Sequence, residues 1–241
     1  MNILLVAATE IEIQPFLGFY AISQTFAHQI SIDPSINIST LVTGPGLLNT
    51  VFHLTQYIAL NKVDLVINAG IAGAFDPKVQ KGTIFNVYRD TIADMGAEHA
   101  DGSFQDVFEM GLMDPNELPY RDAWLYPIDW KPMNQIRTAT SVTVNKVSGS
   151  LSSIQKLKQK YQPDIESMEG AGVFYTCNML KIPSLQIRAI SNHVEPRNKA
   201  NWDIPLAIKA LNDYLIEFIQ RMHTKQNIDF KNQCRLVKTI L

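Results

Sequence analysis

The feature that most constrains the fold of this chain is the alternation of short, apolar, β-branched segments with longer amphipathic segments. Several short segments, bounded by Gly, Pro, Asn or Asp, have the length and composition of buried strands: Ile3–Ala8, Val63–Asn68, Thr83–Val87, Thr138–Val144 and Leu185–Ile190. Others have apolar residues at helical spacing: Leu47–Leu60, Glu169–Leu180 and Ile204–Met222. The alternation predicts an α/β fold in which helices flank a central, mixed, twisted β-sheet as three layers.

The length of 241 residues is near the upper size for a single hydrophobic core, and the 46% of hydrophobic residues can fill that core. We therefore predict one domain over residues 1–225, followed by a tail or surface helix over residues 226–241. The polar and aromatic segment Ala93–Lys131 is longer than most loops of a compact domain. It is predicted to be a functional excursion or a subunit contact.

Charge and composition exclude several classes of partner. The net charge is −2 and the charges are scattered, so nucleic acid is not an expected partner. The amino terminus lacks the basic region of a signal peptide, and no apolar run is long enough to span a membrane, which predicts a cytoplasmic protein. The two cysteines, Cys177 and Cys234, and the five histidines show no metal-ligand spacing, so neither a metal nor another cofactor is expected.

Polar residues with possible chemical roles follow or end four of the predicted elements. They are Glu10 and Glu12, Asn68–Gly73, Ser167–Gly170 and Arg188–Asn192. Ligands of open α/β sheets bind at the carboxyl ends of the strands, so this placement predicts a site there. The run Gly70–Gly73 lacks a dinucleotide fingerprint, and Gly44–Gly46 lacks the Lys and Ser/Thr of a P-loop, although its amides can hold an anion.

Each of these places also has a purely structural interpretation. Glu10 and Glu12 are either carboxylates at a helix amino terminus or carboxylates at a strand end, and one of them can serve as a general base. The small residues of Asn68–Gly73 fit a tight turn as well as a ligand contact. Glu169 can be a solvated first-turn residue or can bind sugar hydroxyls, and Asn192 can be a turn residue.

Taken together, these segments resemble the nucleoside phosphorylase and nucleosidase superfamily, in the branch that contains methylthioadenosine/S-adenosylhomocysteine nucleosidases and futalosine hydrolases. The similar segments are Ala8–Glu12, Ala69–Ala74, Met168-Glu169 and Arg188–Asn192. The resemblance implies that Glu12 activates water, that Glu169 accepts hydrogen bonds from the ribose and that Met168 packs on the sugar. It further implies substrate contacts at these positions: Gly46, Ile71, Ala72, Gly73, Val144 and Arg197.

The match departs from the adenine-directed members at one residue. Those members have an Asp that protonates the purine N7, whereas Asn192 cannot donate a proton as an acid. An amide N–H can instead donate to N7 or O6 of a 6-oxopurine, which implies hypoxanthine as the leaving base. The run Ser191–Arg197 and the segment Trp202–Pro205 resemble futalosine hydrolases. That branch implies futalosine hydrolysis in menaquinone biosynthesis, by a homodimer or higher homo-oligomer.

The carboxyphenyl group of futalosine would require an apolar slot that ends in a cation. Candidates for the cation are Arg197 and Arg121, and the aromatic residues of Ala93–Lys131 can supply the slot, across a subunit interface as in related nucleosidases.

Three other functions remain open. A phosphorylase would use arginines to bind phosphate, but no arginine precedes Arg89. A methylthioadenosine-type nucleosidase is disfavoured by Asn192, and by Ile71 at a position where that family has Ser. A non-catalytic nucleoside-binding module has no need for both Glu12 and Glu169.

Overall fold

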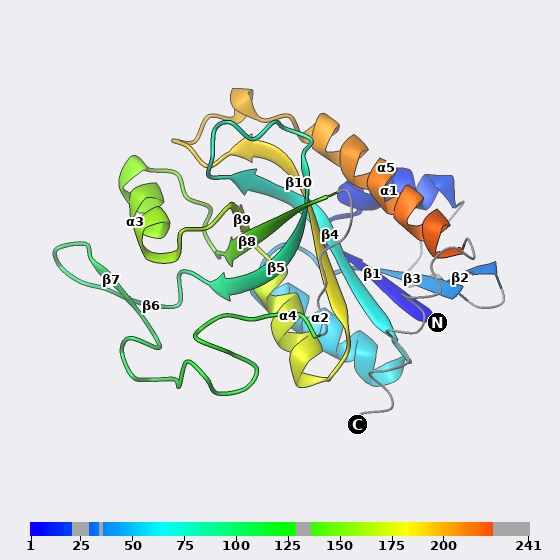
Figure 1. Cartoon of the computed structure of the whole chain (residues 1–241), viewed down its shortest axis with the longest axis horizontal. Helices are drawn as coiled ribbons and strands as arrows, with labels where there is room; N and C mark the ends of the chain where they lie inside the picture. The colour runs from blue at the N-terminus through cyan, green and yellow to red at the C-terminus, as the bar shows by residue number, and fades with distance from the viewer. Residues whose placement is uncertain (21–28, 34–35, 129–135, 224–241) are drawn as a thin grey trace.

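The computed structural model describes residues 1–20, 29–33, 36–128 and 136–223 (Figure 1). The predicted tail over 226–241 and Cys234 lie outside these ranges. The strands are β1 (Asn2–Ala7), β2 (Gln29–Asp33), β3 (Ile36–Val42), β4 (Leu65–Ala74), β5 (Ile84–Ile92), β6 (Gly96–Glu98), β7 (Phe104–Asp106), β8 (Arg137–Thr143), β9 (Ile165–Ser167) and β10 (Ser184–His193). The helices are α1 (Glu10–Phe19), α2 (Leu47–Leu60), α3 (Leu151–Tyr161), α4 (Gly170–Met179), α5 (Ile204–His223) and the 3₁₀ turn η1 (Lys199–Asn201).

The main sheet is mixed, and part of it closes on itself. Its strand order is β10-β5-β8-β9-β4-β1-β3-β2, and β10 also pairs with β4 in parallel. The strands β10, β5, β8, β9 and β4 therefore form a closed ring, from which β1, β3 and β2 extend. This confirms the predicted mixed sheet and adds a closure that the sequence pattern does not indicate.

Helices cover both faces of the sheet, as predicted. Helices α1 and α5 pack together on one face, and α2 and α4 pack together on the other (Figure 1). The largest core cluster lies under α1 and α5 and contains apolar residues of β1, β4 and β10, among them Ile3, Ile67 and Ile187. A second cluster lies under α2 and α4 and includes Leu54 and Val173.

Two segments that were predicted to follow or end strands lie within strands instead. Residues Asn68–Gly73 belong to β4, which runs to Ala74 because β10 pairs with it on one side and β9 on the other. The interpretation of this run as a turn is wrong. Residues Arg188–Asn192 likewise lie inside β10, which bulges between Ile190 and Asn192.

The excursion predicted at Ala93–Lys131 contains the β6–β7 hairpin and is anchored to α3. The Nζ atom of Lys160 lies 3.0 Å from an Asp106 oxygen, and the Tyr161 hydroxyl donates to the same carboxylate at 3.3 Å. Burial and the neighbouring Asp106 raise the pKa of Tyr161, so this hydroxyl keeps its proton. The described part of the excursion is therefore an ordered extension of the domain.

Neither a membrane span nor a metal site is found in the described ranges. Among the helices of residues 1–20, 36–128 and 136–223, none combines the length and hydropathy that a transmembrane segment requires. In the same part of the chain, no three His, Cys, Asp or Glu side chains are grouped so that they could hold a metal ion.

Candidate active site

Glu12 lies at the amino-terminal turn of α1 and reaches across to β4. Its Oε2 accepts hydrogen bonds from Thr9 N at 2.9 Å and Thr9 Oγ1 at 3.0 Å, and its Oε1 accepts from Ile71 N at 3.1 Å. The Thr-x-x-Glu spacing is a capping-box pattern, which explains why the helix begins here. The helix-terminus interpretation is thus correct and the strand-end interpretation is wrong. Glu10 occupies the same turn but is only partly buried.

The peptide of Glu12 is also fixed from the far end of the chain. The buried Asn212 of α5 donates through Nδ2 to the Glu12 carbonyl at 2.8 Å and accepts through Oδ1 from Phe16 N at 2.9 Å. These bonds hold α1 against α5. The position of the Glu12 carboxylate is therefore set by contacts with β4 and α5 as well as by its own helix.

Glu169 is the N-cap residue of α4 and is buried, with 6% of its surface exposed. Its Oε1 accepts from Gly46 N at 3.0 Å, and its Oε2 lies 3.8 Å from Nη1 of Arg188. Gly46 has a φ of +89°, a conformation that glycine adopts easily. The Gly46 amide therefore serves Glu169, and a direct contact between Gly46 and substrate stays a prediction.

The pKa of Glu169 is affected by burial and by the charges of Arg188 and Glu12. Burial raises the pKa of Glu169, while the positive charge of Arg188 and the Gly46 hydrogen bond oppose this shift. The charge of Glu12 raises the pKa of Glu169 further. The two acids are therefore close enough to influence each other.

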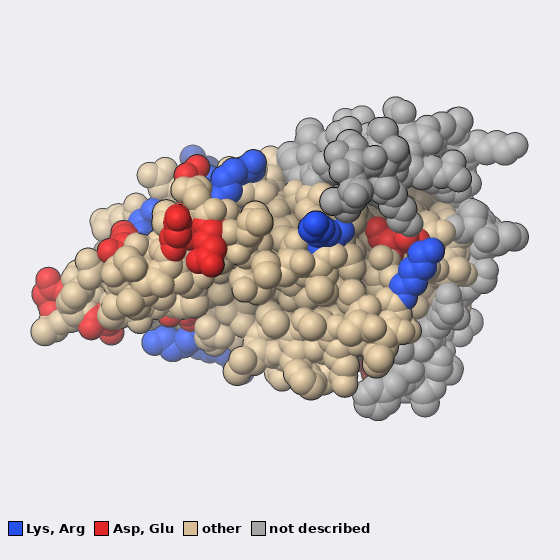
Figure 2. Space-filling view, turned by 90° about the horizontal axis from the view of Figure 1, so that it is seen from below, with Lys and Arg blue, Asp and Glu red and all other residues tan. Residues whose placement is uncertain are grey.

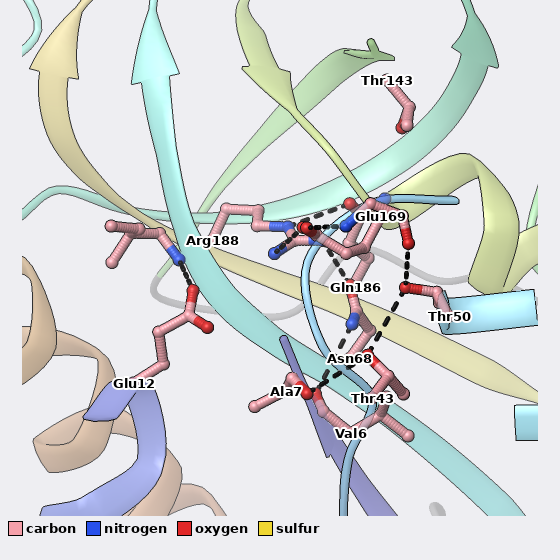
Figure 3. A network of polar contacts seen from close by, with 12 residues as sticks. Val6, Ala7, Glu12, Thr43, Thr50, Asn68, Thr143, Glu169, Gln186 and Arg188 are labelled. Atoms are coloured by element: carbon pink, nitrogen blue, oxygen red, sulfur yellow. Dashed lines mark hydrogen bonds and ion pairs between the residues drawn. The ribbon is translucent and has the colours of Figure 1, made fainter. Parts of the chain in front are cut away.

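Arg188 lies near both acids, and from the sequence it was singled out only as part of Arg188–Asn192, with no role assigned. It is 1% exposed, and its Nε donates to Gln186 Oε1 at 3.1 Å while its Nη2 donates to Asn68 Oδ1. Figure 3 shows Arg188 and Glu169 side by side over β4, with Glu12 approaching from α1. An arginine inside an apolar strand is a detectable signal, because arginine is almost never fully buried without partners.

The absence of a side chain at Gly70 makes this convergence possible. A Cβ atom at Gly70 would lie 2.2 Å from Nη1 of Arg188 and 3.0 Å from Oε1 of Glu12. Real Cβ contacts are never as short as the first of these distances. The Arg188 guanidinium and the Glu12 carboxylate therefore both lie over the Gly70 backbone.

Asn192 lies beside Gly73, two residues further along β4 than Ile71. The β10 bulge pairs Asn192 with Gly73, and a Cβ atom on Gly73 would be 3.1 Å from Asn192 Nδ2. Two strand residues span about 7 Å, so Asn192 lies roughly that far along the strand from the Glu12 contact. Its Oδ1 accepts from Ser191 Oγ at 2.7 Å, and its Nδ2 donates to the carbonyl of His193 at 2.9 Å.

The remaining predicted residues differ in how close they lie to this network. Met168 precedes Glu169 and is half-buried, and Ala72 lies between Ile71 and Gly73 on β4. Val144 is buried in a core cluster with Phe75 and Ile154, and its amide donates to the Ser167 carbonyl at 3.0 Å.

Neither candidate for the cationic cap contacts the carboxylates. Arg197 is exposed, with its guanidinium 5.4 Å from the Trp202 ring. Arg121 is exposed and lies 4.0 Å from the ring of Tyr126, whose carbonyl accepts a hydrogen bond from Asn178. Asn178 is near the end of α4 opposite Glu169, so Arg121 does not reach Glu169 of its own chain.

An α/β domain with paired buried acids at the carboxyl end of its central strands is an arrangement suited to binding and cleaving a small polar ligand. The chain belongs to the phosphorylase superfamily, whose family model matches residues 28–220.

The relatives within this superfamily include nucleoside-cleaving enzymes. The chain is 34% identical to futalosine hydrolase of Streptomyces coelicolor over 62% of its own length and 63% of that protein. It is 26% identical to futalosine hydrolase of Thermus thermophilus over 71% of its own length and 76% of that protein. Its fold resembles the crystal structure of S-adenosylhomocysteine nucleosidase from Streptococcus pyogenes in complex with 5-methylthiotubericidin, with a TM-score of 0.74, 16% identity and coverage of 93% and 98% of the two chains.

Proposed function

We propose that this protein hydrolyses the N-glycosidic bond of futalosine and releases hypoxanthine, a step that belongs to menaquinone biosynthesis in the cytoplasm. The observation that carries the proposal is the convergence of Glu12, Glu169 and Arg188 over Gly70. The similarity to the futalosine hydrolases of Streptomyces coelicolor and Thermus thermophilus supports the choice of substrate.

In this proposal Glu12 is the general base. Its Oε1 lies at the surface of β4 beside the Arg188 guanidinium, so a water held between them can lose a proton to the carboxylate as it attacks the anomeric carbon. The reaction follows the logic of an inverting glycosidase, in which one carboxylate activates water against an oxocarbenium-like transition state.

Glu169 and Met168 are proposed to hold the ribose. A carboxylate accepts hydrogen bonds from hydroxyl groups, and the buried charge of Glu169 favours the positive charge that develops on the sugar. Met168 stands next to Glu169 and is partly accessible. Strand β4 runs from Ile71, which contacts Glu12, to Gly73, which pairs with Asn192. In the proposal, Ile71, Ala72 and Gly73 contact the substrate between its sugar and its base.

Asn192 is proposed to hold the departing base. The His193 carbonyl only accepts and therefore fixes the side of the Asn192 amide that carries Nδ2, while Ser191 donates to Oδ1. One Nδ2 proton is used by the His193 carbonyl, and the second remains for an acceptor such as N7 or O6 of hypoxanthine. A base with an amino group at position 6 offers a donor where this site needs an acceptor, so the site should discriminate against adenine.

Water is favoured over phosphate as nucleophile because Arg188 is engaged by protein side chains and lies beside an acid. Its Nε donates to Gln186 and its Nη2 to Asn68, and its Nη1 lies 3.8 Å from the Glu169 carboxylate, which disfavours a second anion there. Phosphate binding needs a guanidinium that can offer a bidentate edge to the anion. The interactions within the described ranges thus support hydrolysis.

We also propose that the protein is a homodimer whose interface includes α2. Helix α2 has no charged residue, and Leu48 and Phe52 on it are 87% and 61% exposed. Figure 2 shows a broad area without Lys, Arg, Asp or Glu on the side of the molecule where α2 and α4 lie in Figure 1. Exposed large apolar residues on such a face are typical of an interface.

Substrate choice is tested by incubating the purified protein with futalosine, inosine or methylthioadenosine in phosphate buffer, where hydrolases and phosphorylases both turn over. Chromatography of the released base should show hypoxanthine from futalosine at the highest rate and no adenine. Faster release of adenine from methylthioadenosine would instead identify an adenine-directed nucleosidase. Binding of a nucleoside with no release of base would identify a binding module.

A further inference from the structure

A buried polar chain lies beneath the active site, and the proposed chemistry does not use it. Asp90 of β5 is 0% exposed, and its Oδ2 accepts from Gln186 Nε2 at 3.0 Å. The other end of the same amide, Gln186 Oε1, accepts from Arg188 Nε at 3.1 Å. Figure 3 shows Gln186 next to Arg188 on β10, at the back of the network. We propose that Asp90 is a positioning residue that acts through Gln186 to hold Arg188 against Glu169, an inference that rests on the proposed function.

The proposed role of Asp90 depends on the orientation of the Gln186 amide. A carboxylate only accepts hydrogen bonds and the Arg188 Nε only donates, so the two neighbours require opposite ends of the amide. If the amide turned over, its NH₂ group would face Arg188 and its oxygen would face Asp90, and both contacts would be repulsive. The charge on Asp90 therefore selects the orientation in which Gln186 accepts from Arg188.

Asp90 is ionised when it does this at neutral pH. Burial raises the pKa of Asp90 to about 6, and hydrogen bonds from Gln186 and Thr143 and the charge of Arg188 oppose a larger shift. A buried carboxylate is costly unless it is hydrogen-bonded. Asp90 meets this condition through Gln186 and Thr143, and Gln186 in turn contacts Arg188.

The surroundings leave the Gln186 amide no room for an alternative partner. A Cβ atom on Gly170 would lie 1.9 Å from Gln186 Oε1 and 2.4 Å from Asp90 Oδ2, so the backbone of α4 closes over this pair. Thr143 Oγ1 donates to Asp90 Oδ1 at 3.0 Å and accepts from Ala171 N at 2.8 Å. The same carboxylate therefore also fixes the first turn of α4, which Glu169 caps.

The first test uses Gln186→Met and Asp90→Asn, which nearly keep side-chain volume and remove the amide and the carboxylate charge. We expect each variant to lower kcat for futalosine by about 10–100-fold, as expected for a displaced active-site group. The loss in the double variant should be smaller than the product of the two single losses, because Asp90 acts on Arg188 through Gln186. The matched control is Thr176→Val in α4, which removes a buried hydroxyl that has no hydrogen-bond partner within the described residues and should leave kcat unchanged. Full activity in Gln186→Met, or strictly additive losses in the double variant, would overturn the inference.

A second test does not depend on turnover and therefore separates this inference from the proposed function. In a ¹⁵N-labelled protein, the Nε–H signal of Arg188, assigned by its loss in Arg188→Lys, should be protected from solvent exchange. The signal should exchange faster in Gln186→Met and in Asp90→Asn but not in Thr176→Val. An unchanged signal in Asp90→Asn would contradict the inference, whatever substrate the enzyme takes. If the signals behave as expected but no nucleoside is cleaved, only the proposed function fails.

Discussion

At the scale of single residues, Glu12 combines a structural role with the proposed role of general base. Its Oε2 caps α1 through Thr9, while its Oε1 is held over β4 by the Ile71 amide. One carboxylate oxygen thus immobilises the side chain and the other lies beside Arg188. Removing only the charge of Glu12 should therefore abolish its proposed chemical role while the side chain keeps its structural role.

Glu12→Gln should therefore lower kcat for futalosine by about 100-fold or more, the range expected for loss of a general base. Asn192→Ala should lower it by about tenfold, because it removes one neutral hydrogen bond to a base that can also leave as a delocalised anion. Steady-state kinetics on both variants measure the order. Glu10→Gln, on the same helical turn, is the matched control and should retain activity. A larger loss in Asn192→Ala than in Glu12→Gln would contradict the assigned roles.

The residue types of the site could be predicted from the sequence, but their contacts could not. Glu12, Glu169 and Asn192 were selected by their positions near predicted elements and by their resemblance to a known family. The surroundings of Arg188 are evident only from the pairing of β10 with β4, because that register places Arg188 opposite Gly70. The sequence places an arginine within an apolar strand, where a charge needs partners. The partners of Arg188, which are Gln186, Asn68 and Glu169, depend on tertiary structure.

At the scale of elements, α2 should form the subunit interface. Leu48 and Phe52 lie one turn apart on this helix and are both exposed. Replacing both by Glu would place charges in an apolar contact and should convert the dimer into a monomer, as measured by sedimentation velocity. Lys209→Glu on the exposed side of α5 is a control that should leave the dimer intact. A wild-type protein that sediments as a monomer would contradict the proposed dimer.

The helices α2, α4 and α5 were predicted with bounds close to those of the structure, whereas helix α3 was not predicted and strand β4 was predicted to end too early. Helix α2 was predicted with the bounds that the structure has, because its apolar residues and preceding glycine define it locally. Strand β9 has three residues and exists only through its pairing with β8 and β4. Helix α1 contains Pro15 and is stabilised by Asn212 of α5, so its sequence alone gives a weak helical signal.

At the scale of the whole molecule, the alternation of strands and helices was sufficient to predict the α/β class. The closure of β10, β5, β8, β9 and β4 into a ring was not predictable, because it depends on pairings between residues more than 100 positions apart. This closure brings Asn68, Gly70 and Arg188 together. The contacts within the site therefore depend on the topology of the sheet, whereas the positions of its acids in the chain are local features of the sequence.

The central claim is that water, activated at Glu12, attacks the sugar. The most direct test measures release of hypoxanthine from futalosine in a phosphate-free buffer, followed by addition of phosphate, with the sugar product identified by mass spectrometry. Hydrolysis by water predicts the same rate of hypoxanthine release in both buffers and a free sugar product. A rate that depends on phosphate, together with a sugar 1-phosphate product, would contradict the account and identify a phosphorylase.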